Sequence, residues 1–202
     1  MTQTKNIKYE AGFALLMTLL VLGVVIAVTL GLVELTLKTL QLSVDSTDSE
    51  IAFHAANAGI ECAKYSRRIE STNFETGGTV PFSCFGSSGN LTKVAHGFVT
   101  VPSPLVAANG QVNRYTRNID WGTAPNARCT SMDIITIVAT TSVTIGGTGN
   151  NSLKLKISGY ENDTKTCVAG GRCTIISVAG YSGVCSATST EGVLKREILL
   201  EF

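Results

Sequence analysis

The residues with the most distinctive chemistry in this 202-residue chain are its cysteines: Cys62, Cys84, Cys129, Cys167, Cys173 and Cys185. An even number of cysteines fits either disulfides in an oxidising compartment or thiolate ligands of a metal ion. Metal sites favour close pairs such as C-x-x-C, and the sequence has none. We therefore predict disulfides and no metal site. Spacing does not choose among the pairings; we favour Cys167–Cys173, since the loop CVAGGRC contains a Gly-Gly pair.

Motifs for catalysis are absent from the sequence. The two histidines, His54 and His96, have no partner at the spacing of H-E-x-x-H, and there is neither a G-x-S-x-G elbow nor a phosphate loop. Trp121 together with Tyr115 and Arg114 suggests ligand stacking, but a lone Trp is more typical of a core or an interface. We predict that the chain is not an enzyme and uses no cofactor.

The composition and the net charge of the chain point to no acidic partner. Charged residues make up 15% of the chain, the formal net charge is +1, and there are 20 glycines. Basic residues are scattered, with no RNP-like or zinc-finger spacing, so no contact with nucleic acid is expected.

A long run of apolar residues near the N-terminus is expected to anchor the chain. Phe13 to Val33 are 21 consecutive uncharged residues, and as a helix they span about 31 Å, the thickness of a bilayer core. The run is longer than the core of a signal peptide, and the residues after it continue the helical pattern. Lys5 and Lys8 precede it, which predicts a cytoplasmic N-terminus and an extracytoplasmic remainder.

The helical pattern continues over residues 34–69. This segment has no proline and one glycine, Gly59, and small or apolar residues recur at helical spacing. A single helix from Phe13 to Ile69 would be roughly 85 Å long, too long for one globular domain to bury. Its front half must therefore pack against lipid or against other subunits.

Residues 70–202 are predicted to form a β-rich head. Residues 71–130 read as loops around short strands, one of them in HGFVTVPS (residues 96–103). Stronger strand patterns cover Met132–Ile145, Ser152–Tyr160, Cys173–Gly183 and Gly192–Phe202. Ser152–Tyr160 alternates apolar and polar residues, which is typical of a half-buried strand. The expected class is α+β, with a long N-terminal helix packed on an antiparallel meander.

The segment around Gly12 resembles the start of a type IV prepilin or pseudopilin. The resemblance implies that residues 1–12 are a leader peptide, that a prepilin peptidase cuts between Gly12 and Phe13, and that Phe13 is then N-methylated. It also implies that residues 13–33 serve first as a membrane anchor and later as the core of a filament. Implied partners are other pilin subunits and the inner-membrane assembly platform.

Two further features indicate a minor subunit. Major pilins commonly carry Glu at the fifth residue after the cut, whereas this chain has Met17 there. The segment IAFHAANAGIECA (residues 51–63) is similar to the Ala-rich segment of PilX-type minor pilins and K-type pseudopilins. Small side chains at this spacing also allow close approach of a helix to a sheet. The resemblance implies a minor subunit, first in the inner membrane and then in an extracellular filament.

Two other functions stay open at this point. One is a single-pass, membrane-anchored surface domain that binds a ligand and never enters a filament. The other is a secreted enzyme with an uncleaved anchor, against which the missing catalytic motifs argue.

Overall fold

The computed structural model describes residues 10–95, 110–123, 127–157, 159–187 and 193–202. Helix α1 (Glu10–Ile69) is continuous, so the expected helix through residue 69 is confirmed. Contacts divide the chain into two units, residues 1–46 and 47–202, and α1 contributes to both. Most of the predicted leader, residues 1–9, lies outside the described residues.

The first unit is an apolar helix that exposes its side chains. Every side chain described from Phe13 to Ser46 is exposed. The threonine hydroxyls in this stretch bond to backbone carbonyls of the preceding turn: Thr18 to Leu15, Thr29 to Val25, Thr36 to Leu32 and Thr39 to Leu35. Hydroxyls satisfied inside the helix can enter an apolar medium at low cost.

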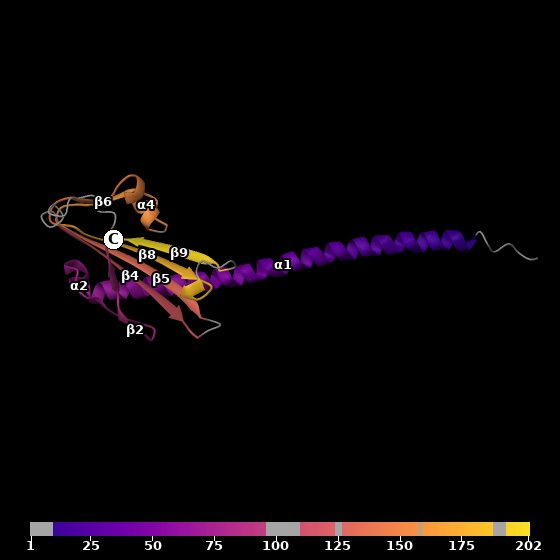
Figure 1. Ribbon diagram of the computed structural model, residues 1–202, viewed down its shortest axis with the longest axis horizontal. Coiled ribbons are helices and arrows are strands. Elements are labelled where there is room, and N and C mark those ends of the chain that lie inside the picture. Colours follow the sequence, from indigo (N-terminus) through magenta and orange to yellow (C-terminus); the bar gives the residue numbers. More distant parts are fainter. Residues whose placement is uncertain (1–9, 96–109, 124–126, 158, 188–192) are drawn as a thin grey trace, which may run out of the picture. The chain divides into compact units, whose positions relative to one another are not determined.

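The second unit is built on a five-stranded antiparallel sheet, with the order β3-β4-β5-β8-β9. Figure 1 labels four of these strands, β4, β5, β8 and β9. The strands are β3 (Thr92–Val94), β4 (Gly110–Trp121), β5 (Arg128–Ala139), β8 (Arg172–Tyr181) and β9 (Lys195–Glu201). The expected α+β layout, a helix packed on an antiparallel sheet, is confirmed for this unit.

Both faces of the sheet are covered at β5, which explains the run of apolar residues from Ile134 to Ala139, interrupted only by Thr136. Met132 and Ile134 face a core shared with Ile60 and Ala63 of α1. Ile135 and Ile137 face a second core on the other side of the sheet. Successive strand residues point to opposite faces, so a strand buried on both sides needs apolar residues at nearly every position.

Small residues let α1 lie directly on the sheet. A Cβ atom added to Gly180 of β8 would lie 2.0 Å from the carbonyl oxygen of Ala52 and 2.4 Å from the nitrogen of Ala56. A Cβ added to Gly59 would meet a methyl group of Thr130 at 2.3 Å. Ala52 and Ala56 are fully buried. The close packing expected from the Ala-rich segment is therefore present, and it requires glycine on both partners.

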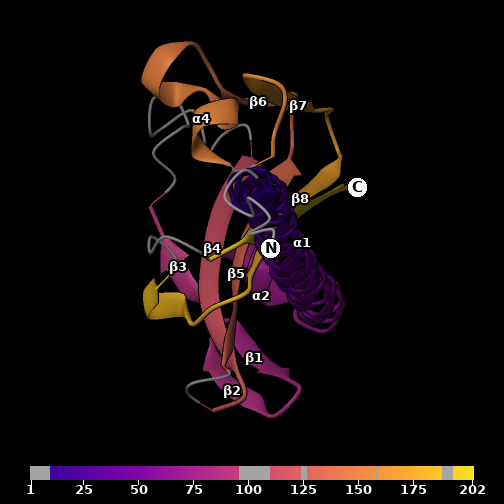
Figure 2. The ribbon, with the colours of Figure 1, turned by 90° about the vertical axis from the view of Figure 1, so that its right-hand side faces the viewer.

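An insertion between β5 and β8 overturns one strand prediction. It contains β6 (Val143–Gly146), the 3-10 turn η1 (Gly149–Asn151), the short helix α4 (Leu153–Lys156) and β7 (Thr164–Cys167), grouped together in Figure 2. The predicted strand Ser152–Tyr160 is wrong, because this stretch makes a helical turn in which Leu153 and Ile157 are buried and Leu155 is exposed. An alternating pattern places apolar residues at positions i, i+2 and i+4. In a helix, residues i and i+4 lie on the same face, so the same pattern also fits a helical turn.

Other strand predictions also need correction. The predicted strand Met132–Ile145 is two strands, because β5 ends at Ala139 and β6 begins at Val143. The long strand β4 lies in the region expected to hold only short strands. The expected strand at residues 96–103 lies outside the described residues. Strand β9 lies within the segment predicted for it, and β8 begins one residue before its predicted segment and ends inside it.

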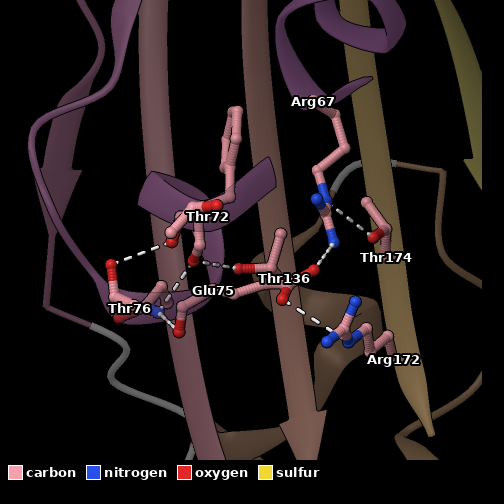
Figure 3. A network of polar contacts seen from close by, with 9 residues as sticks. Arg67, Thr72, Glu75, Thr76, Thr136, Arg172 and Thr174 are labelled. Carbon is pink, nitrogen blue, oxygen red and sulfur yellow. Dashed lines mark hydrogen bonds and ion pairs between the residues drawn. The ribbon is translucent and has the colours of Figure 1, made fainter. Parts of the chain in front are cut away.

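Helix α2 (Ser71–Thr76) is held by side chains of the sheet that bond to its carbonyls. Asn113 Nδ2 and Thr136 Oγ1 both donate to the carbonyl of Phe74, each at 2.9 Å (Figure 3 shows Thr136). The Tyr115 hydroxyl donates to the carbonyls of Asn73 and Gly78. The last carbonyls of a helix lack partners within it, so these bonds satisfy the end of α2 and fix it on the sheet.

Three disulfides are present, as expected from the cysteine count. They join Cys62 of α1 to Cys84 of β1 (Pro81–Cys84), Cys129 of β5 to Cys185 of η2 (Cys185–Ala187), and Cys167 of β7 to Cys173 of β8. The third is the pair favoured from the sequence. The first fixes the hairpin of β1 and β2 (Ser87–Asn90) to α1.

A polar contact attaches the insertion to β9. Lys165 of β7 donates to the carboxylate of Glu201 at 2.6 Å, and Tyr160 also bonds to this carboxylate. Burial, together with that bond to Glu201, raises the pKa of Tyr160. Burial alone would raise the pKa of Glu201, but the bonds from Lys165 and Tyr160 outweigh it and lower that pKa. The carboxylate is therefore charged at neutral pH and holds the two elements together.

Candidate functional site

A groove lies where α1 ends, bounded by α2, the beginning of β8 and the end of β9. Its volume is about 890 Å³. The last turns of α1 contribute Tyr65 and Arg68, and the strands contribute Arg172, Leu200 and Phe202. Its size falls in the range of ligand pockets, so we take it as the candidate binding site of the second unit.

Two arginines of the groove, Arg67 and Arg172, share the carboxylate of Glu75, as Figure 3 shows. Glu75 Oε1 accepts from Arg67 Nη2 at 3.0 Å, and Glu75 Oε2 lies 3.4 Å from Arg172 Nε. Arg67 also donates from Nε to the Thr174 hydroxyl at 3.2 Å. The side chains of Arg67 and Glu75 are 10% and 16% exposed, whereas that of Arg172 is 68% exposed. The buried pair is a structural link between α1 and α2, and Arg172 presents its guanidinium to solvent.

Replacing Glu75 by glutamine should lower the free energy of unfolding by about 2 kcal/mol, because the buried Arg67 guanidinium loses its counter-charge. The measurement is the urea midpoint of the full-length protein in detergent, followed by the fluorescence of Trp121, the single tryptophan. Glu61→Gln is the control, because Glu61 forms an exposed ion pair with Lys64 and its loss should cost under about 1 kcal/mol. Equal effects of the two changes would contradict the structural role of Glu75.

The second candidate surface is the apolar side of the chain's first unit. Among the described helices, α1 alone is long and apolar enough to cross a membrane. The most apolar part of this helix contains no buried residue. Phe13, the residue predicted to be methylated, is 66% exposed. Met17, at the position usually occupied by Glu in major pilins, is 48% exposed. Glu34 pairs with Lys38 one turn later at 2.8 Å. A surface this apolar needs lipid or protein around it.

The remaining residues singled out in the sequence do not form a site. Tyr115 is fully buried, while Arg114 next to it pairs with Asp133. The Trp121 indole donates to Thr130 Oγ1 at 2.6 Å, so these aromatic residues do not meet Arg114 around a ligand. His54 is exposed, 3.7 Å from the carboxylate of Glu50, and His96 lies outside the described residues.

One group of described residues brings metal-ligand types together: Asp120, Cys129 and Cys185. The two cysteines are bonded to each other and so offer no thiolate. Asp120 accepts the backbone N–H of Cys185 at 2.7 Å. The carboxylate supports the turn at η2, and the group does not suit a metal ion.

The groove could not be found by a motif search. Its residues come from two distant parts of the sequence, one formed by α1 and α2 and the other by β8 and β9, and its arginines follow no recognised spacing. The one local signal is the pair Arg67–Arg68, the basic residues in the last turn of α1. That pair is equally typical of an ordinary helix C-terminus, where positive charge is favourable.

These features define an α+β protein with a disulfide-linked β-sheet unit and one apolar helix of membrane-spanning length. No family model, curated protein or solved structure matches the chain.

Proposed function

We propose that this protein is a minor pilin or pseudopilin, a structural and assembly subunit of a type IV pilus-like filament. The observation that carries the proposal is the composition of α1. Its exposed stretch from Phe13 is apolar. Its later stretch from Ala52 consists largely of small residues and packs against an antiparallel sheet. The same helix thus presents an apolar surface to lipid or to neighbouring helices and a second surface to the β-sheet of its own chain.

The mechanism is physical. The chain is held in the inner membrane with its N-terminus in the cytoplasm, and a prepilin peptidase removes residues 1–12. The new N-terminal residue, Phe13, is methylated. The assembly platform then draws the subunit out of the bilayer. The apolar helix exchanges lipid for the helices of other pilin subunits at little hydrophobic cost, because both surroundings are apolar.

Met17 supports a minor role within the filament. A glutamate at this position could pair with the N-terminal ammonium of a neighbouring subunit inside the apolar bundle. A methionine offers no such charge, and the first acidic residue after Phe13 is Glu34, which pairs with Lys38 of the same helix. A subunit of this kind is suited to an end of the filament better than to its repeating body.

Gly12→Ala tests the proposal. In cells that contain a prepilin peptidase, the variant should accumulate in the membrane as uncut precursor, while the unaltered chain should lose residues 1–12 and begin with a methylated Phe13. N-terminal sequencing and intact mass measure both outcomes. Gly23→Ala is the matched control, since a Cβ at Gly23 meets no atom within 4 Å and should leave cleavage unchanged. Normal cleavage of Gly12→Ala would overturn the proposal.

The alternative is a single-pass, membrane-anchored surface domain that binds a ligand without entering a filament. The groove at the end of α1 is the observation that favours it. Recovery of the unaltered protein with Met1–Gly12 intact, in cells that cut other prepilins, would support this function instead.

A further inference from the structure

The groove at the end of α1 carries an excess of positive charge. The charged side chains of its described lining are the cations Lys64, Arg67, Arg68 and Arg172 and the carboxylates of Glu61 and Glu75. Lys64 pairs with Glu61 at 2.8 Å, and Glu75 is shared by Arg67 and Arg172. One carboxylate between two guanidinium groups leaves a net positive charge at the centre of the groove.

Two of these cations are available to a ligand. Among the described residues, the Arg172 guanidinium forms an ion pair with Glu75 alone, from Nε at 3.4 Å, and its side chain is 68% exposed. Arg68 is exposed on the same side of α1 as Tyr65 and has no ion pair with any described residue. The planar fork of an arginine suits a carboxylate in two-point contact, so Arg172 is oriented to receive one.

The rest of the wall is apolar and aromatic. Tyr65 and Phe202 are 59% and 60% exposed, and Leu200 is half-buried between the groove and the core. Exposed aromatic side chains beside an arginine are typical of protein-binding hot spots, where an anchoring side chain loses its water and a charge fixes its orientation.

We propose that this groove binds an acidic peptide segment of a partner protein, with one carboxylate on Arg172 and Arg68 and an adjacent aromatic or aliphatic side chain against Tyr65 and Phe202. The carboxylates of Glu61 and Glu75 stand beside these cations. They would repel a continuous polyanion such as a nucleic acid, but they leave room for a single carboxylate flanked by apolar side chains. The inference concerns the second unit alone and does not depend on how residues 1–46 are used.

The probe is the peptide acetyl-Gln-Phe-Asp-Phe-Gln-amide, which carries one carboxylate between two aromatic side chains, titrated into the full-length ¹⁵N-labelled protein in detergent micelles. Amide shifts should change at Tyr65, Arg68, Arg172 and Phe202 and not at Trp121. The matched neutral peptide, acetyl-Gln-Phe-Asn-Phe-Gln-amide, should bind about tenfold more weakly, since it lacks the carboxylate.

Two variants should move the affinity in opposite directions. Arg172→Gln should weaken binding of the acidic peptide by about five- to tenfold, and Glu61→Gln should strengthen it by about two- to threefold. Both side chains are exposed, so neither change should shift the Trp121 unfolding transition by more than about 1 kcal/mol, which separates a loss of binding from a loss of fold.

Three results would overturn the proposal. The first is the absence of shifts in the groove at millimolar peptide. The second is unchanged affinity in Arg172→Gln. The third is equal or tighter binding of a ten-residue oligothymidylate at the same amides, which would assign the groove to a polyanion.

Discussion

Gly180→Ala should lower the free energy of unfolding of the sheet unit by about 3 kcal/mol. The new Cβ would lie 2.0 Å from the carbonyl oxygen of Ala52, 2.4 Å from the nitrogen of Ala56 and 3.0 Å from its Cα. All three are backbone atoms of α1, so no side-chain rotation relieves the overlap. The helix must move away from β8, and the packing around the fully buried Ala52 and Ala56 loosens.

The urea midpoint of Trp121 fluorescence, in the full-length protein in detergent, measures this effect. Gly183→Ala is the control two residues after the end of β8. Its Cβ would approach only side-chain atoms of Val193, the nearest at 3.0 Å, which can shift, so the change should cost under about 1 kcal/mol. A Gly180→Ala protein as stable as Gly183→Ala would show that α1 does not lie directly on β8.

Removal of the Cys129–Cys185 disulfide should be the most destabilising of the three disulfide losses, at about 4 kcal/mol. The bond closes the longest loop, with a sequence separation of 56, against 22 for Cys62–Cys84 and 6 for Cys167–Cys173. A longer loop restricts the unfolded chain more when it is closed. Removal of the other two should therefore cost about 3 and about 2 kcal/mol, in that order.

Double serine variants of each pair, compared by the same unfolding assay, check this ranking. Each pair has one deeply buried cysteine, namely Cys62, Cys129 and Cys167, so the cost of placing a serine hydroxyl in the core is similar in all three. The ranking would be contradicted if loss of Cys167–Cys173 were the most damaging. In that case native contacts around the insertion, and not loop closure, would determine the effect.

The sequence by itself determined the helix and the class of the fold. An apolar run from Phe13 to Val33, followed by residues without proline, can satisfy its backbone in lipid only as a helix, and α1 indeed extends to Ile69. Strand β8 was predictable because β-branched and apolar residues are dense in it, and β9 because polar and apolar residues alternate loosely along it. The even cysteine count predicted disulfides, because that inference needs only composition and compartment.

Only the tertiary structure decided which residues meet. The alternation in Ser152–Tyr160 was ambiguous, and the second core under the insertion turned it into a helical turn by burying Leu153 and Ile157 together. Strand β4 carries Asn, Arg and Thr between its apolar residues, because Asn113 bonds to α2 and Arg114 pairs with Asp133, and neither partner is visible locally. The groove arises in the same way: Glu75 and Arg172 are distant in sequence, and charge attraction acts through space once the sheet brings them together.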